Sequence, residues 1–213
     1  MTNHQTDVLR TYTEAVHATE EALTALDQLS GDGDFGRNLR EGLDRTLTLL
    51  DHEPRESATA TAATAFLDHV GGTSGPLLGL LLREVGRALE TEQDHLAGWS
   101  AGVREGLAAV QRVGEAEPGD RTMVDVLVPA RDAFAAGASF TGVARTALAA
   151  AAATADMRAR RGRASYVGAR ALGVPDPGAV GVALLFWALA RVSEPGSALG
   201  DPADLVPVPE RHG

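Results

Sequence analysis

The sequence predicts an all-α protein, an antiparallel bundle of about eight helices that run up and down with short connections. Three observations support this prediction. Apolar residues recur at helical spacing along most of the 213-residue chain. No stretch alternates apolar and polar residues as a half-buried strand would. Segments rich in glycine, proline and acidic residues interrupt the helical pattern at intervals that suit helix connections.

Eight helices are expected in order, at about residues 7–29, 37–50, 58–70, 77–89, 95–113, 122–136, 140–156 and 179–192. Ser57 and Asp176 are placed to cap the third and eighth helices. Pro129 should kink the sixth helix or fray its start. The eighth is apolar nearly all round, so we expect it to be central. The helical domain should span residues 1–192, and the proline-rich tail, 193–213, should be irregular.

The composition limits the chemistry that the chain can perform. All 19 basic residues are arginine and no cysteine is present, which excludes lysine and thiol nucleophiles and zinc thiolate sites. A formal net charge of -10 argues against nucleic acid or an anionic membrane as a partner. The N-terminus has no apolar run typical of a signal peptide, and the longest apolar stretch is too short to span a bilayer. We expect a cytoplasmic protein.

Three aspartates lie close together between the first two helices. Asp27, Asp32 and Asp34 lie within one turn-sized segment and are spaced by glycines. Because like charges repel, a bound hard cation such as Mg²⁺ is one reason for a fold to hold them together. A solvated acidic turn is the alternative. A calcium-binding EF-hand loop is excluded, because Arg37 stands where glycine is required and Leu43 where an acidic ligand is required.

The other glycine-rich connections favour the cation site over the solvated turn. In an up-and-down bundle, every second connection lies at the same end. The odd-numbered connections, at residues 27–36, 71–76, 114–121 and 157–178, contain the clustered Asp, Gly, Thr, Ser and Arg residues. The even-numbered ones are ordinary polar turns. We therefore expect the four odd-numbered connections to converge on one rim of the bundle.

The residues of this rim suit a nucleotide phosphate. Thr73 and Ser74 stand at a helix start, where free N–H groups and the helix dipole favour an anion. Arg163 offers a planar, permanently charged fork for phosphate oxygens. With Mg²⁺ on the aspartates, these groups predict a phosphoryl-transfer site. Each also has a simpler interpretation: the glycines at 71–72 end a helix, Ser74 and Asp176 are only caps, and the arginine run is solvated.

Four motifs in this order resemble the L subunit of dihydroxyacetone kinase, DhaL, over nearly the whole chain. They are Leu26-Asp27 with Gly31-Asp32-Gly33-Asp34, Gly72-Thr73-Ser74-Gly75-Pro76, Gly119-Asp120-Arg121-Thr122-Met123, and Gly162-Arg163-Ala164-Ser165-Tyr166 with Asp176-Pro177-Gly178-Ala179. The resemblance implies an eight-helix antiparallel barrel with a nucleotide at one rim. It also implies that Asp27, Asp32 and Asp34 bind two Mg²⁺ ions. It places the nucleotide contacts at Gly36, Asn38, Thr73, Ser74, Gly119, Met123, Arg163, Asp176 and Gly178.

The resemblance further implies a partner. In the family, a K subunit holds dihydroxyacetone covalently, and the L subunit supplies the phosphoryl group. We predict no catalytic side chain in this chain. The nucleotide is either exchangeable ATP or tightly held ADP that a phosphotransferase-system protein rephosphorylates. The expected function is therefore phosphoryl transfer to dihydroxyacetone or a related ketose. The alternatives are a non-catalytic ADP- or ATP-binding regulatory subunit and a helical interaction domain.

Three positions depart from the family pattern. Phe35 stands directly after the last metal-binding aspartate, where the family usually has histidine, and phenylalanine has no hydrogen-bond donor for a phosphate. Ala169 lies near a position where glutamate is common. Val174 replaces a frequent histidine before the Asp-Pro-Gly motif. The predicted metal ligands are intact, whereas the surroundings of the phosphoryl group are altered.

Overall fold

The computed structural model describes residues 4–52 and 57–207, and these residues form helices and turns without a strand. Eight helices are long: α1 (His4–Ser30), α2 (Phe35–His52), α3 (Ala58–His69), α4 (Ser74–Thr91), α5 (His95–Gly114), α6 (Val124–Ala135), α7 (Phe140–Ala153) and α9 (Pro177–Ser193). Short elements complete the described chain: the four-residue helices α8 (Ala164–Val167) and α10 (Pro202–Leu205) and the 3-10 turns η1 (Thr154–Asp156) and η2 (Gly168–Ala171).

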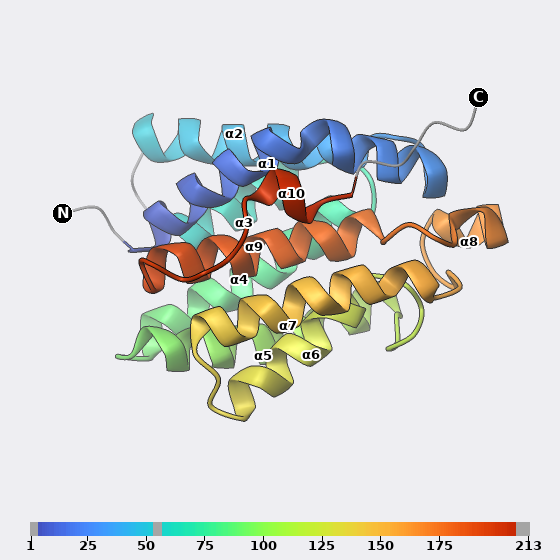
Figure 1. Ribbon diagram of the computed structural model, residues 1–213. Coiled ribbons are helices and arrows are strands. Elements are labelled where there is room, and N and C mark those ends of the chain that lie inside the picture. The colour runs from blue at the N-terminus through green and yellow to red at the C-terminus, as the bar shows by residue number, and fades with distance from the viewer. Residues whose placement is uncertain (1–3, 53–56, 208–213) are drawn as a thin grey trace.

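The eight long helices close into a ring. Each helix from α1 to α6 packs on the next, and α9 packs on both α7 and α1. Figure 1 shows them side by side, with their connections at the two ends of the bundle. Their apolar faces meet inside, where Leu23, Leu82, Val103 and Leu184 have no exposed surface. The predicted eight-helix antiparallel barrel is confirmed.

Helix α9 is buried all round, as its sequence predicted, because a further segment covers its outer side. Every residue from 177 to 190 is buried. The indole N–H of Trp187 donates to the carbonyl of Gly200 at 3.0 Å, and Val206 is buried against the same core. Figure 1 shows α10 lying over α1 and α9. The tail, which the sequence predicted to be irregular, therefore contains a helical turn packed on the barrel.

The local start signals largely act as the sequence predicts. The hydroxyl of Ser57 accepts from the N–H of Ala60 and caps α3. Helix α6 begins at Val124, two residues later than predicted, and continues through Pro129. In the tail, Asp201 caps α10, a signal that the high proline content concealed. None of the described helices is both long and apolar enough to span a bilayer.

Candidate nucleotide-phosphate site

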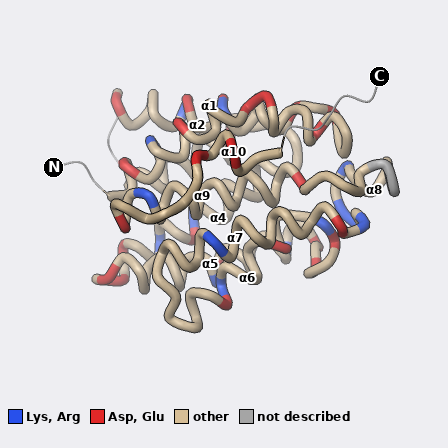
Figure 2. Tube along the Cα trace, in the orientation of Figure 1, with Lys and Arg blue, Asp and Glu red and all other residues tan. Residues whose placement is uncertain are grey.

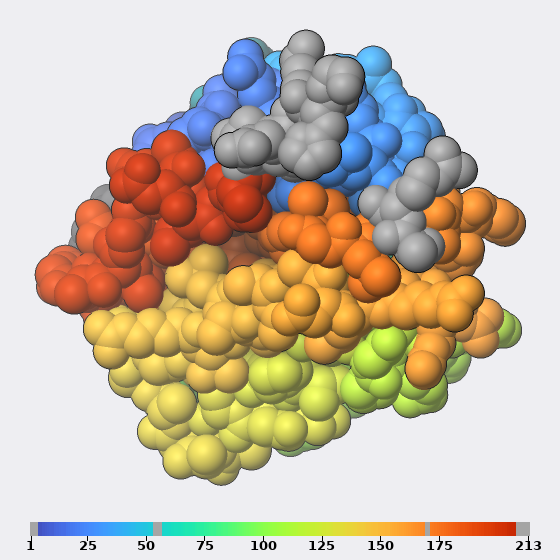
Figure 3. Space-filling view, turned by 45° about the vertical axis from the view of Figure 1, so that its right-hand side comes forward, coloured from blue at the N-terminus to red at the C-terminus, as the bar shows by residue number. Residues whose placement is uncertain are grey.

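All four odd-numbered connections line one cavity at the end of the barrel where α1 ends and α4 begins. The predicted convergence is thus confirmed. Of the twelve predicted site residues, ten line this cavity: Asp27, Asp32, Asp34, Asn38, Thr73, Ser74, Met123, Arg163, Asp176 and Gly178. Gly36 and Gly119 are not among the lining residues. Figure 3 shows the segment around residues 160–178, in orange, between the blue N-terminal helices and the green α5–α6 connection.

The connection between α1 and α2, residues 31–34, contains Asp32 and Asp34, and we call it the acidic loop. Its glycines allow its sharp turn. The N–H of Gly31 donates to the carbonyl of Asp27, and a Cβ at position 31 would lie only 2.2 Å from Asp27 Oδ1. Gly33 has a φ of +78°, a conformation that residues with a side chain rarely adopt. The chain can therefore turn sharply after α1 and bring its carboxylates back toward the cavity.

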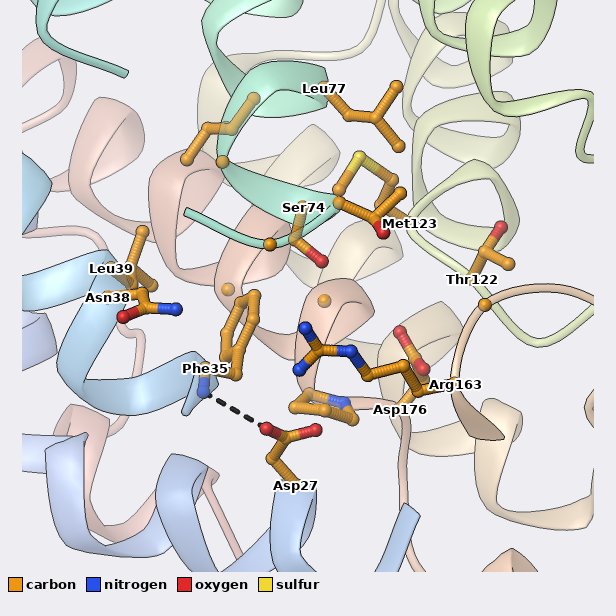
Figure 4. A pocket seen from close by; sticks show the side chains of 18 of the residues that line it. Asp27, Phe35, Asn38, Leu39, Ser74, Leu77, Thr122, Met123, Arg163 and Asp176 are labelled. Atoms are coloured by element: carbon orange, nitrogen blue, oxygen red, sulfur yellow. Dashed lines mark hydrogen bonds between the residues drawn. The ribbon is translucent and has the colours of Figure 1, made fainter. Parts of the chain in front are cut away.

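The three carboxylates have different partners. Asp27 is 8% exposed and accepts a hydrogen bond from the N–H of Phe35 at 3.0 Å (Figure 4). Asp34 pairs with Arg37 at 2.6 Å, and Asp32 pairs with Arg163. Among the described residues, no three His, Asp or Glu side chains gather closely enough to hold one ion. All three aspartates nevertheless line the same cavity and supply the oxygen donors that Mg²⁺ prefers.

The start of α4 lies opposite the acidic loop. Thr73 precedes the helix without making a side-chain cap, and Ser74 is its first residue. Gly72 has a φ of +77°, and a Cβ there would lie 3.9 Å from both Arg163 Nη2 and Asn38 Nδ2. Two polar side chains from different elements, Arg163 and Asn38, thus approach the turn before α4, where the free helix N–H groups favour an anion.

The start of α9 forms the adjoining wall. Asp176 accepts from the N–H of Ala179 at 2.8 Å and caps the helix, as predicted. A Cβ at Gly178 would lie 3.1 Å from Asp176 Oδ2, 3.9 Å from Met123 Cε and 4.0 Å from Ser74 Oγ. Side chains from α9, the α6 start and α4 therefore meet around a position that has no side chain of its own. Figure 4 shows Ser74, Met123, Arg163 and Asp176 facing this space.

The ionisation of Asp176 is perturbed. Burial raises the pKa of its carboxyl to about 6, and the nearby acids Asp125 and Asp27 act in the same direction. The N–H of Ala179 and the guanidinium of Arg121 oppose this increase. Near pH 6, this group therefore changes charge inside the cavity wall.

The two predicted glycines that do not line the cavity have structural roles, Gly36 in helix packing and Gly119 in a backbone hydrogen bond. A Cβ at Gly36 would lie 2.5 Å from the carbonyl oxygen of Glu20 and 2.5 Å from Thr24 Oγ1, so glycine allows α2 to approach α1 closely. The N–H of Gly119 donates to Asp125 Oδ1 at 2.5 Å. Another glycine, Gly114 at the end of α5, lines the cavity instead.

The sequence prediction also missed polar residues in the α5–α6 connection and in the first turn of α6. Asp125 is buried and accepts from the N–H groups of Gly119 and Thr122, which fixes the turn before α6. Arg121 is 1% exposed and lines the cavity. The spacing of Thr122 and Asp125 is a capping signal that was readable in the sequence. Nothing in the sequence indicated that Arg121 would be buried.

Phe35 fills part of the cavity. A Cβ at Gly181 would lie 2.8 Å from Phe35 Cζ, so the ring rests directly against the backbone of α9. The carbonyl of Val174 accepts from Arg121 Nη2 at 2.9 Å. The third departure from the family pattern, Ala169, has a side chain outside the described residues. In the structure, Phe35 therefore has a packing role and the backbone of Val174 a hydrogen-bonding role.

Comparison with known proteins identifies the family. A sequence model of the DAK2 domain matches residues 29–191. L-erythrulose 1-kinase of Mycolicibacterium smegmatis is 38% identical over 197 residues, which are 86% of this chain and 34% of that protein. The ADP-binding subunit DhaL of the PEP-dependent dihydroxyacetone kinase 1 of Listeria innocua is 34% identical over 186 residues, 86% of this chain and 92% of that subunit.

A solved structure supports the same assignment. The crystal structure of dihydroxyacetone kinase from C. freundii in complex with AMP-PNP and Mg²⁺ superimposes with a TM-score of 0.67 at 27% identity, covering 86% of this chain and 33% of that one. The chain spans about a third of the length of the erythrulose kinase and of the rat triokinase/FMN cyclase, which is 39% identical. It nearly matches the DhaL subunit in extent. The chain belongs to the DAK2 domain family.

Proposed function

We propose that the chain is the Mg²⁺- and nucleotide-dependent phosphoryl-transfer subunit of a kinase for dihydroxyacetone or a related small ketose. The observation that carries the proposal is the meeting of three aspartates, the start of α4 and Arg163 around one cavity. Two of the relatives, an erythrulose kinase and an ADP-binding DhaL subunit, agree with this chemistry. So does the nucleotide and Mg²⁺ content of the related crystal structure.

The aspartates would hold the metal. Their oxygen donors fit Mg²⁺, which binds through one or two carboxylates together with substrate phosphates and so needs no cage of three side chains. The family resemblance extends this to two ions on Asp27, Asp32 and Asp34. When bound, Mg²⁺ offsets the charge of the phosphates and aligns them for transfer.

The chain's own groups would bind and orient the nucleotide. The N–H groups at the start of α4 and the guanidinium of Arg163 would contact phosphate oxygens. The backbone at Gly178 would allow close approach beside Asp176. The buried Met123 and its apolar neighbours in the cavity would contact the nucleoside. We assign no catalytic side chain, because positioning and charge neutralisation carry most of this class of reaction.

The acceptor would be held by a partner. In this proposal, a K subunit binds dihydroxyacetone and meets the cavity at the rim of the barrel. The nucleotide is either ATP or bound ADP that a phosphotransferase-system phosphocarrier rephosphorylates. The reaction would be cytoplasmic. Residues 1–192 would form the nucleotide-binding domain, with the tail 193–213 following it.

Calorimetry with ADP and Mg²⁺ tests the proposal directly. We expect saturable binding by the wild-type chain and its loss in Asp27→Asn, because the buried carboxylate is a proposed ligand. Asp51→Asn is the matched control, since Asp51 is exposed and pairs with Arg10 away from the cavity. A folded wild-type protein that binds neither ADP nor ATP with Mg²⁺ would contradict the proposal. Reconstitution with a K subunit, followed by detection of phosphorylated dihydroxyacetone, tests the transfer step.

One observation favours a second candidate, a non-catalytic ADP- or ATP-binding regulatory subunit. Phe35 lies at the cavity without a donor for the phosphoryl group. A regulatory subunit would bind nucleotide but give no turnover with any K subunit. Turnover that Asp32→Ala abolishes would exclude this candidate.

A further inference from the structure

A buried arginine outside the predicted ligand set holds part of the cavity wall. Arg121 is 1% exposed, and its φ of +62° is uncommon for a residue with a side chain. Burial lowers the pKa of its guanidinium, while the charge of Asp176 acts in the opposite direction. Within the described part of the chain, its Nε and Nη1 atoms have no hydrogen-bond partner. A buried charge is costly, so its contacts need an explanation.

Its contacts are with a segment about fifty residues later. Arg121 Nη2 donates to the carbonyl of Ala171 at 2.8 Å and to that of Val174 at 2.9 Å. Two further bonds fasten the same stretch to η1, directly after α7: the N–H of Gly173 donates to the carbonyl of Ala155 at 2.9 Å, and that of Asp176 donates to Thr154 Oγ1 at 2.8 Å. The C-terminal part of the connection between α7 and α9 is thus held to Arg121.

The N-terminal part of that connection is held by the neighbouring residue. The carbonyl of Asp120 accepts from the N–H of Arg160 at 3.1 Å, and the two side chains form a longer ion pair at 4.0 Å. Arg163 lies between these two attachment points and reaches into the cavity (Figure 4). Figure 2 shows arginines and acidic residues side by side at the α8 end of the barrel. The turn before α6 therefore braces both parts of the segment that carries Arg163.

We propose that Arg121 is a positioning residue, which holds residues 157–176 against the α6 turn so that Arg163 and Asp176 face the ligand. The identity of that ligand rests on the proposed function, whereas the bracing role rests on the hydrogen bonds alone. In this proposal Arg121 acts through the backbone of this segment, to which its Nη2 donates. Its Nη2 nitrogen carries two N–H groups, so this one nitrogen can donate to both carbonyls at once.

Limited trypsin digestion reports on the bracing. Arg158, Arg160, Arg161 and Arg163 are exposed and lie within the braced segment. In Arg121→Met, which keeps the length of the side chain but removes its donors, we expect cleavage in this segment at least about tenfold faster, since local opening sets the rate. Arg131→Met is the matched control on α6, where the partly exposed Arg131 pairs with its neighbour Asp132. It should digest like the wild type.

Nucleotide affinity separates positioning from general loss of structure. We expect Arg121→Met to raise the Kd for ADP with Mg²⁺ by about tenfold or more, the scale of a lost charge-assisted bond. If Arg121 acts through Arg163, most of this loss should disappear when Arg163→Gln is already present, because the two effects are then not additive. Circular dichroism checks that each variant is folded.

Each outcome decides a separate question. Unchanged digestion and unchanged affinity in Arg121→Met would overturn the positioning role. Full additivity with Arg163→Gln would also overturn it. If Arg121→Met does not fold, Arg121→Gln, whose side chain is shorter and uncharged, decides by the same two measurements. If the wild type binds no nucleotide, the proposed function fails, and the digestion experiment alone still tests the bracing.

Discussion

The carboxylate of Asp32 and the guanidinium of Arg163 form an ion pair that joins the acidic loop to the segment before α8. One partner is a proposed metal ligand and the other a proposed phosphate ligand. Both side chains are partly exposed, so the pair itself contributes at most about 1 kcal/mol. In the proposed complex, Mg²⁺ would take the place of Arg163 beside Asp32, and phosphate would take the place of Asp32 beside Arg163, so each side chain would keep a partner of the same sign of charge.

Arg163→Gln should therefore affect the two ligands in opposite directions. Affinity for Mg²⁺ alone should rise, by no more than about fivefold, because Asp32 loses a competing cation. Affinity for ADP with Mg²⁺ should fall by about tenfold or more, because a phosphate contact is lost. Calorimetry with each ligand measures both effects. A fall in affinity for Mg²⁺ alone would show that the pair does not compete with the metal.

The pKa of Asp176 predicts a pH-dependent stability difference. Its folded-state pKa is raised from 3.8 to about 6, so its contribution to stability is complete below about pH 4 and is lost as the pH rises through 6. Asp176→Asn keeps a capping side chain and cannot ionise. Relative to the wild type, its free energy of unfolding should gain up to about 3 kcal/mol between pH 4 and pH 7.

Denaturant titrations of both proteins at several pH values measure this difference, and other titrating groups cancel in the comparison. Asp176→Ala is the control for the cap, and it should lose about 1 kcal/mol relative to Asp176→Asn at every pH. A difference between wild type and Asp176→Asn that does not change with pH would mean that the carboxyl titrates at its ordinary pKa.

Gly36 offers a test of packing against ligand contact. Gly36→Ala would place a methyl group against the backbone of Glu20, so we expect a loss of about 1–3 kcal/mol in the free energy of unfolding. Thermal melting followed by circular dichroism measures it. The Kd for ADP of the folded fraction should stay near the wild-type value, because Gly36 does not line the cavity. A stable variant with weakened ADP binding would instead support the nucleotide contact that the family resemblance implies.

Phe35→His tests the altered surroundings of the phosphoryl group. Histidine supplies the donor that phenylalanine lacks, so turnover with a K subunit should rise by about tenfold, the scale of one hydrogen bond formed at the transferring group. Phe35→Leu is the matched control without a donor and should not raise turnover. Equal turnover in the wild type and Phe35→His would mean that this position does not contact the transferring group.

The sequence determined the barrel and its rim through signals that are local. Helical periodicity, the caps at Ser57 and Asp176 and the glycine-rich breaks predicted eight long helices, and their number alone placed four connections at one end. The C-terminal helical turn was missed because its role depends on the outer side of α9, which only the folded barrel presents. A proline-rich composition gives no sign of such a surface.

The site residues also differ in whether local sequence signals predict them or only the folded barrel reveals them. Asp27 and Asp176 were predictable because their motifs combine a chemical group with a local turn. The burial of Arg121 was not, because its two acceptor carbonyls lie about fifty residues away and no spacing rule connects them. Gly36 was assigned to the ligand from resemblance alone, whereas its surroundings in the structure are backbone and side chain of α1.

The enclosure of α9 has a thermodynamic consequence for any ligand at its start. The residues from 177 to 190 are held by the barrel and by the tail, so the backbone at Gly178 is already fixed before a ligand arrives. Binding there requires little loss of conformational entropy.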